Sequence, residues 1–336
     1  MRGTNAPLRV GLAGAGWVTQ HHLRSWTDIA GRASVTAIAD PNLGAARGRA
    51  AAFGIPAVYD SVDAMLHAER LDAIDIAAPR EAHAPLCRLA ARHGLAVLCQ
   101  KPLAATLAEA EALVADLTNA RLMVHENWRF RPHYRTIAGW LREGRVGDVR
   151  TSTMSVLTSG LIADAAGALP AVARQPMFAT LDRLLLMEVL IHHVDTLRFL
   201  LGPLSLRAAQ LGTSCAAVRG EDRAALLLTT AAGAAVTLVG DFAAHGHPPE
   251  QFDRLEILGT RGAVILERDR LRLVGAVEED LKLDLPANYL ASYTAAITHF
   301  VDRLADDGPF ETSPEDNLET LRIVEAAYRA DGGLPR

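Results

Sequence analysis

The stretch Leu8-Arg-Val-Gly-Leu-Ala-Gly-Ala-Gly-Trp-Val-Thr-Gln-His-His22 decides the fold of this chain. Its apolar residues Leu8, Val10 and Leu12 predict a short buried strand, and the glycine turn that follows leads into a helix expected over 17–26. A strand, a tight glycine turn and a helix, in this order, are the setting in which a glycine fingerprint binds a dinucleotide.

The residues of this fingerprint have distinct expected roles. Gly14 allows the tight turn, and Gly16 lets backbone N–H groups approach a pyrophosphate at the positive end of the helix. Thr19 holds the third glycine position, so the fingerprint is imperfect. The next predicted strand, 34–40, ends on Asp40, whose carboxylate can accept hydrogen bonds from an adenosine ribose and repels a 2′-phosphate. A dinucleotide site that favours NAD over NADP is predicted, although Asp40 alone is also explained as a turn residue.

Length and composition limit the class of protein. At 336 residues the chain is long enough for two domains, and 50% hydrophobic with 22% charged residues is typical of a globular protein with an ample core. The formal net charge of −5 comes without a basic block, which argues against a nucleic-acid partner. The longest uncharged stretch, 224–240, contains threonines and a central glycine and predicts a hairpin rather than a membrane span.

The cysteines and the first residues of the chain indicate the cellular compartment of the protein. Cys87, Cys99 and Cys215 are widely spaced and cannot all pair, so no metal site is predicted and a reducing compartment is expected. No signal peptide is predicted, because the glycine turn interrupts the first apolar run. A cytoplasmic protein without a membrane partner is therefore expected.

Strands and helices alternate as far as residue 124, which is typical of a doubly wound parallel sheet. The expected strands after the second are 57–59, 72–79, 95–99 and 121–124. The expected helices include 44–53, one capped at Ser61, 83–94 and one that begins with a capping box at Thr106. This pattern predicts an α/β, Rossmann-type, NAD(P)-binding domain over residues 1–124.

The pattern changes to long strands with tight turns after residue 125. The strands are expected at 149–157, 204–213, 224–230, 234–242, 254–258, 262–267 and 271–274. We expect an α+β substrate-binding and oligomerisation domain over 125–336, with a large, open-faced, mostly antiparallel mixed sheet. Helices would cover one face and self-association the other, as a homodimer or homotetramer. The final helix, 313–331, is a candidate to pack back on the first domain.

Lys101 is the first candidate for chemistry. It follows a strand end directly and precedes a proline that restricts its backbone. Because open α/β sheets bind ligands beyond the carboxyl ends of their strands, its ammonium can stabilise negative charge on a substrate oxygen. The alternative is a solvated loop lysine.

The stretch Glu188-Val-Leu-Ile-His-His-Val-Asp-Thr-Leu-Arg198 is the second concentration of chemistry. On an α-helix, His192 shares a face with Glu188 at i, i+4 and with Asp195 at i, i+3, so a carboxylate can orient a general base. Two alternatives compete: a metal site at the paired histidines, which lacks the second ligand turn of a zincin, and a surface salt bridge between Asp195 and Arg198.

The quoted stretches together resemble the glucose–fructose oxidoreductase / inositol dehydrogenase / MocA (Gfo/Idh/MocA) family over nearly the whole chain. The matching stretches are 11–16, 37–40, 74–79 with His83, 99–102, 127–132, 192–195 and 259–262. The resemblance implies a Rossmann domain, an open-faced sheet through which subunits associate, and NAD(P)-dependent oxidation of a sugar or polyol hydroxyl or the reverse reduction. It also implies that Lys101 and His192 act at the substrate alcohol.

The chain departs from the family pattern at Gln100, where a glutamate is usual, at Glu188, where an aspartate is usual, and at Leu190, where a glycine is usual. These departures would retune the pocket or weaken catalysis. A catalytically silent dinucleotide-sensing regulator of the same fold, bound to a protein partner, is therefore the alternative to an enzyme.

The expected site divides into three groups. The catalytic residues are Lys101, His192 and Glu188. The cofactor-binding residues are Gly11, Gly14, Ala15, Gly16, Trp17, Val18, Asp40, Ala78, Pro79, His83, Gln100, Lys101 and Arg129. The substrate-binding residues are Lys101, Asn127, Arg129, Arg174, Gln175, His192 and His193.

Overall fold

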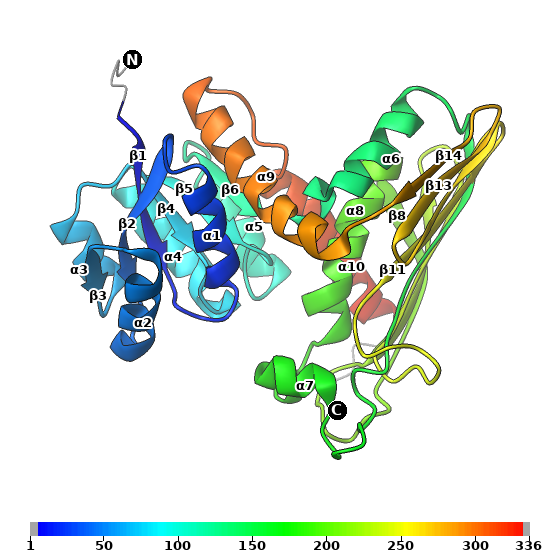
Figure 1. Cartoon of the computed structure of the whole chain (residues 1–336), viewed down its shortest axis with the longest axis horizontal. Coiled ribbons are helices and arrows are strands. Elements are labelled where there is room, and N and C mark those ends of the chain that lie inside the picture. The colour runs from blue at the N-terminus through cyan, green and yellow to red at the C-terminus, as the bar shows by residue number, and fades with distance from the viewer. Residues whose placement is uncertain (1–5, 332–336) are drawn as a thin grey trace. The chain divides into compact units, whose positions relative to one another are not determined.

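The computed structural model describes residues 6–331 (Figure 1). This part of the chain divides into two compact units: residues 6–131 with Tyr289–Glu319, and Pro132–Asn288 with residues 320–331. The expected boundary at residue 124 differs from this division, because the first unit runs on to Arg131 and takes in a segment from late in the chain. The final helix belongs to the first unit only as far as Glu319.

The first unit contains a six-stranded sheet with the order β3-β2-β1-β4-β5-β6, in which every neighbouring pair is parallel. Its strands are β1 (Leu8–Ala13), β2 (Ala33–Ala39), β3 (Ala57–Tyr59), β4 (Ala73–Ile76), β5 (Ala96–Gln100) and β6 (Leu122–His125). Its helices include α1 (Thr19–Asp28), α2 (Leu43–Phe53), α3 (Val62–Ala68), α4 (Arg80–Arg92), α5 (Leu107–Asp116) and the 3₁₀ turn η1 (Trp128–Phe130). The predicted doubly wound sheet is confirmed, and its strand order reverses between β1 and β4, where such sheets bind ligands.

Capping residues place the starts of several helices. The Ser61 hydroxyl accepts a hydrogen bond from the Ala64 N–H at the start of α3, and Thr106 and Glu109 form the predicted capping box of α5. A capping side chain is worth about 1 kcal/mol, because it satisfies a backbone N–H that has no partner inside the helix.

A helix that the sequence did not predict completes the first unit. In α9 (Leu285–Ala305), Ile297 and Phe300 join Val10 and Trp26 in one buried core. The rings of Trp26 and Phe300 meet edge to face, with centroids 6.5 Å apart. A parallel sheet buries both of its faces, and here a segment remote in sequence supplies part of the cover next to α1.

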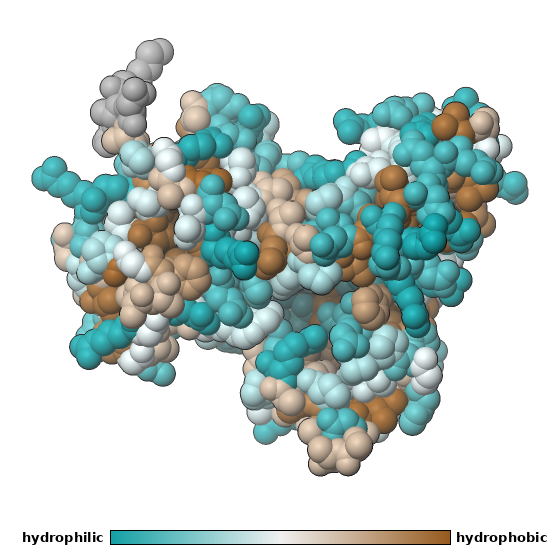
Figure 2. All heavy atoms as spheres, in the orientation of Figure 1, coloured by the Kyte–Doolittle hydropathy of each residue, from teal (hydrophilic) through white to brown (hydrophobic). Residues whose placement is uncertain are grey.

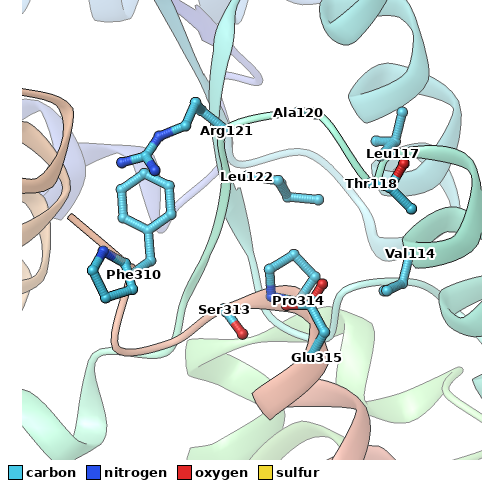
Figure 3. A pocket seen from close by; sticks show the side chains of 11 residues that line it. Val114, Leu117, Thr118, Ala120, Arg121, Leu122, Phe310, Ser313, Pro314 and Glu315 are labelled. Carbon is cyan, nitrogen blue, oxygen red and sulfur yellow. The ribbon is translucent and has the colours of Figure 1, made fainter. Parts of the chain in front are cut away.

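A hollow of about 310 Å³ lies where α5 ends and β6 begins (Figure 3). Leu117 and Leu122 line it from these elements, and Phe310 and Pro314 line it from the segment before the last helix. The Arg121 guanidinium lies 4.5 Å from the centroid of the Phe310 ring. Because the hollow adjoins the amino end of β6, it lies away from the strand ends at which cofactors bind.

The second unit contains an eight-stranded sheet with the order β14-β13-β12-β11-β7-β10-β9-β8. Only β7 and β10 pair in parallel, so the sheet is mixed and mostly antiparallel, as predicted. The strands are β7 (Val149–Leu157), β8 (Leu204–Gly212), β9 (Arg223–Thr230), β10 (Ala235–Asp241), β11 (Asp253–Gly259), β12 (Gly262–Glu267), β13 (Arg270–Gly275) and β14 (Glu279–Lys282). The helices are α6 (Pro132–Arg142), α7 (Pro170–Arg174), η2 (Pro176–Ala179), η3 (Leu185–Leu190), α8 (Ile191–Leu201) and α10 (Pro314–Ala330) from Thr320 onward.

Burial alternates along the strands of this sheet. Leu226 and Leu228 of β9 are buried, whereas Leu227 between them is 42% exposed. Helices α6 and α8 lie on one face, and no helix of the described chain covers the other (Figure 1). The predicted open-faced sheet is confirmed.

The uncharged stretch 224–240 forms the antiparallel pair of β9 and β10, as predicted. Between residues 6 and 331, no helix combines the length and the apolar character needed to cross a membrane.

Candidate functional site

The turn between β1 and α1 requires glycine at Gly14. Its φ is +110°, and a Cβ there would lie 2.4 Å from the carbonyl oxygen of Ala77. The Gly14 N–H donates to the Ala39 carbonyl at 2.8 Å, which closes the turn against β2. Any side chain would therefore push apart the ends of neighbouring strands.

Gly16 differs from Gly14, because a Cβ built on it meets no atom within 4 Å. The space before α1 is therefore open on this side. The first turn of α1 holds no acidic residue, and the cap residue Val18 makes no side-chain hydrogen bond to it. Open space beside N–H groups at the positive end of a helix fits a pyrophosphate.

Asp40 fixes the far side of the turn. Its carboxylate accepts hydrogen bonds from the N–H of Ala15 at 2.8 Å and the N–H of Asn42 at 2.7 Å. The carboxylate thus ties the glycine turn to the end of β2. Arg49, a residue that the sequence did not single out, donates to the Gly16 carbonyl at 3.1 Å and brings a positive charge to the same turn.

Replacing Gly16 by valine tests this placement of the cofactor. We expect a wild-type midpoint of thermal unfolding, because the new side chain enters open space. NAD⁺ should bind at least about tenfold more weakly, which corresponds to about 1.4 kcal/mol. Calorimetric titration measures the affinity, and Gly31→Val, at another open glycine, is the control. Unchanged affinity would remove Gly16 from the cofactor site.

Lys101 directly follows β5, and both of its neighbours are held by the first unit. The Lys101 N–H donates to Gln100 Oε1 at 2.7 Å. The Pro102 carbonyl oxygen lies 2.7 Å from His83 Nδ1, and the Ala78 carbonyl oxygen lies 2.9 Å from His83 Nε2. The buried His83 contacts both carbonyl oxygens, and its tautomer decides which ring nitrogen donates. His83, expected at the cofactor, thus ties the end of β4 to the segment that carries Lys101.

His192 is the second residue of α8 in the second unit and is buried. The expected α-helix from Glu188 onward is not continuous, because Leu185–Leu190 is a π-helix. Its wider i→i+5 hydrogen bonding means that the α-helical i, i+4 spacing does not describe the pair Glu188 and His192. Asp195 does lie on the same α-helix as His192, and its side chain is buried.

A buried carboxylate anchors the start of this π-helix. Glu221 accepts hydrogen bonds from the N–H of Leu186 at 2.9 Å, the N–H of Leu184 at 3.3 Å and the hydroxyl of Tyr328 at 2.7 Å. Burial raises the pKa of Glu221, and the hydrogen bonds from Tyr328 and the backbone oppose that rise. The segment that carries Glu188 is thereby fixed to the loop before β9 and to α10.

Three expected site residues are engaged within the fold. Buried Asn127 donates to Ser292 Oγ at 2.8 Å, and buried Arg129 pairs with Asp316 at 2.7 Å. His193 Nε2 lies 2.9 Å from Asp253 Oδ1, and its Nδ1 lies 3.1 Å from the Val189 carbonyl oxygen. Partners within the fold hold these three side chains, and their expected roles at the cofactor and substrate stay predictions.

The remaining candidates occupy different surroundings. Arg174 is exposed at the end of α7, and Gln175 separates α7 from η2. Trp17 is 45% exposed beside the glycine turn, whereas Gly11 is a packing position, since a Cβ there would lie 2.7 Å from Leu71 Cδ1. Pro79 is the N-cap residue of α4. Within the described residues, no group of three or more histidine, cysteine or acidic side chains could hold a metal ion.

Comparison with known proteins identifies both halves of the chain. Residues 8–128 match the GFO_IDH_MocA model, described as an oxidoreductase family with an NAD-binding Rossmann fold, and residues 134–265 match the GFO/IDH/MocA C-terminal domain. The chain belongs to the Gfo/Idh/MocA family.

Individual relatives cover almost the full length of this family member. It is 35% identical to the D-apiose dehydrogenase of Paraburkholderia graminis, over 94% of this chain and 86% of that protein. It is 29% identical to an inositol 2-dehydrogenase of Rhizobium meliloti, over 96% of each. An oxidoreductase from Agrobacterium radiobacter, solved in complex with NAD⁺, L-tartaric acid and magnesium, matches with a TM-score of 0.89 at 28% identity, over 97% of each chain.

These findings confirm three expectations. The resemblance to the Gfo/Idh/MocA family was correct, the cofactor is a nicotinamide dinucleotide, and the protein is a dehydrogenase rather than a catalytically silent regulator.

Proposed function

We propose that this Gfo/Idh/MocA oxidoreductase oxidises a secondary or anomeric hydroxyl of a small sugar or polyol with NAD⁺, or catalyses the reverse reduction. The observation that carries the proposal is Lys101, held at the carboxyl end of β5 through its own amide and through the next carbonyl. Such a position lies at the ligand-binding edge of a doubly wound sheet.

The glycine turn would hold the cofactor. The N–H groups that follow Gly14 and Gly16 would bind the pyrophosphate, and Arg49 would add a positive charge beside it. Asp40 would accept hydrogen bonds from the adenosine ribose with lone pairs that Ala15 and Asn42 leave available, and its charge favours NAD over NADP. NAD⁺ bound there supplies the hydride acceptor.

His192 and Lys101 would share the work at the substrate hydroxyl. The imidazole of His192 would take the hydroxyl proton, and the Lys101 ammonium would stabilise the negative charge that develops on the oxygen. Lys101 belongs to the first unit and His192 to the second. Glu188, Arg174 and Gln175 would contribute to the substrate side from the second unit.

The relatives guide the choice of substrate. Two relatives are named D-apiose dehydrogenase and share 35% and 30% identity with this chain. Another is named inositol 2-dehydrogenase. A pentose-sized or cyclic polyol substrate is therefore the first class to test.

A substrate screen tests the proposed activity. The purified protein is mixed with NAD⁺ or NADP⁺ and with D-apiose, other pentoses, hexoses or inositols, and formation of the reduced cofactor is followed by absorbance. We expect turnover with at least one sugar or polyol and a preference for NAD⁺. Tight NADH binding without turnover of any member of the panel in either direction would contradict the proposal.

We further propose that the open sheet face joins copies of this chain. Strand register places Leu227, Val239, Leu258 and Val274 on that face, each between 37% and 42% exposed. Thr237, Thr153 and Glu256 share this face by register. Figure 2 shows hydrophobic and hydrophilic residues mixed over the visible surface of the molecule. An exposed sheet face with several apolar side chains is typical of an interface.

Replacing Leu227 by lysine tests the interface. The wild type should have a mass that is a multiple of 36.0 kDa by light scattering, and Leu227→Lys should shift it toward the monomer because a buried unpaired charge is costly. Val277→Lys, at an exposed apolar residue outside the strands of the sheet, is the control and should assemble normally. A monomeric wild type, or a variant that assembles like the wild type, would exclude this face.

A cytoplasmic location is the companion proposal. All three cysteines are free, with Cys87 and Cys99 buried, as expected for a protein of a reducing compartment.

A further inference from the structure

Behind Lys101 the first unit contains a chain of buried polar side chains that the proposed chemistry does not use. Gln100 Nε2 lies 3.2 Å from His22 Nε2, and His22 Nδ1 lies 2.8 Å from Asp75 Oδ2. Trp26 Nε1 donates to the same Asp75 oxygen at 2.7 Å. His22 and Asp75 are fully buried, and Gln100 is 9% exposed.

The two ends of this chain fix the direction of every hydrogen bond in it. The Lys101 N–H can only donate, so the oxygen of the Gln100 amide faces it and the NH₂ group faces His22. An amide NH₂ can only donate, so His22 Nε2 accepts and the proton lies on Nδ1. That proton is donated to Asp75, which also accepts from Trp26. His22 is therefore a neutral imidazole in one defined tautomer.

We propose that Gln100, His22 and Asp75 form a relay that positions Lys101, and that the amide of Gln100 keeps His22 neutral. The relay acts through the Lys101 backbone, so its members are positioning residues and not catalytic ones. This inference rests on the proposed role of Lys101.

This chain has an amide at Gln100, where the family pattern has a glutamate. The hydrogen bonds of Gln100 explain why an amide is needed there. A glutamate at position 100 would still accept from the Lys101 N–H, but its second oxygen would face His22 Nε2. Two carboxylates would then flank one imidazole, and His22 would have to carry a second proton. The carboxamide avoids this, because it offers an acceptor to Lys101 and a donor to His22.

Two rings, those of His125 and Tyr293, pack against His22 in the first unit. The His125 ring on β6 lies 4.3 Å away between centroids, and the Tyr293 ring on α9 lies 5.5 Å away. Burial raises the pKa of Tyr293, so this neighbour is uncharged near neutral pH. Burial is the main cause that lowers the pKa of His21, the neighbour on α1, to about 4.

The first test needs no substrate. Protein labelled with ¹⁵N in histidine reports the tautomer of each ring by nitrogen NMR, and the His22 signal is assigned by its loss in His22→Gln. We expect a neutral His22 with its proton on Nδ1 at pH 7, and a doubly protonated His22 in Gln100→Glu. A wild-type His22 with its proton on Nε2, or a neutral His22 in Gln100→Glu, would overturn the relay.

The second test asks whether the relay acts on Lys101. Gln100→Met keeps the length of the side chain and removes both hydrogen bonds. We expect hydrogen exchange of the Lys101 amide to quicken at least about tenfold and kcat to fall about tenfold or more. Gln20→Met is the control, because its side chain makes no hydrogen bond within the part of the chain that the structure describes. Wild-type amide exchange in Gln100→Met would overturn the proposal.

The outcomes separate this inference from the proposed function. If no sugar or polyol is turned over, the proposed activity fails, whereas the tautomer and the amide exchange still decide the relay. If turnover is found and Gln100→Met matches the wild type in both exchange and kcat, the relay fails alone. In Gln100→Glu, the extra titrating group should also add a transition to the pH profile of kcat, which a merely structural role would not do.

Discussion

Replacing His192 by alanine is expected to lower kcat by at least about 10²-fold, because proton transfer by a positioned side chain contributes about 10²–10⁴-fold to the rate. NADH affinity should stay close to that of the wild type, since the glycine turn belongs to the first unit and His192 to the second. Turnover of the best substrate in the screen and fluorescence titration with NADH measure the two quantities.

His67→Ala is the matched control, because His67 is an exposed histidine on α3, outside the proposed site. Near-wild-type kcat in His192→Ala would remove this imidazole from the mechanism. A variant that loses NADH binding as well would indicate that His192 supports the fold, and thermal unfolding of both variants separates that case.

Replacing Lys101 by methionine is expected to lower kcat by about 10²–10³-fold, because one preorganised donor at a developing negative charge is worth about that much. Methionine keeps the length of the apolar stem and removes the ammonium. The backbone bond from the Lys101 N–H to Gln100 remains possible, so the change isolates the charge.

The composition provides an unusually clean control for Lys101. Lys101 and Lys282 are the two lysines of the chain, and the other cationic side chains are arginines. Lys282 is exposed on β14, so Lys282→Met should leave kcat unchanged. Lys101→Arg should not restore activity, because a planar guanidinium does not replace a compact ammonium. Equal activity of Lys101→Met and the wild type would contradict the proposed function.

Much of the fold followed from local signals. Periodicity and capping residues gave the six strands of the first sheet and the starts of α3 and α5 to within a few residues. The glycine turn and Asp40 were identified from residue type. Glycine has the conformational freedom that a tight turn needs, and an acidic residue supplies the carboxylate at the end of the strand. The structure adds the reason for Gly14, a contact with Ala77 that no local pattern contains.

Other features followed from packing between distant segments. Helix α9 completes the first unit by burying part of its sheet. No pattern in residues 285–305 identifies the sheet against which this helix packs. The start of the π-helix at Leu185–Leu190 is hydrogen-bonded to the Glu221 carboxylate, which comes from the loop before β9. Spacing along the chain did not predict either feature. The π-helix also changed the expected helical pairing of Glu188 with His192.

The sequence by itself determined the family, the nicotinamide cofactor and the two residues proposed to act on the substrate, because these depend on residue types at short spacings. Tertiary structure alone decided which polar groups support the site. Partners within the fold hold Asn127, Arg129 and His193. Hydrogen bonds through Gln100 link His22 and Asp75 to Lys101. The physical reason is that a buried polar group must find a hydrogen-bond partner, and folding chooses that partner from anywhere in the chain.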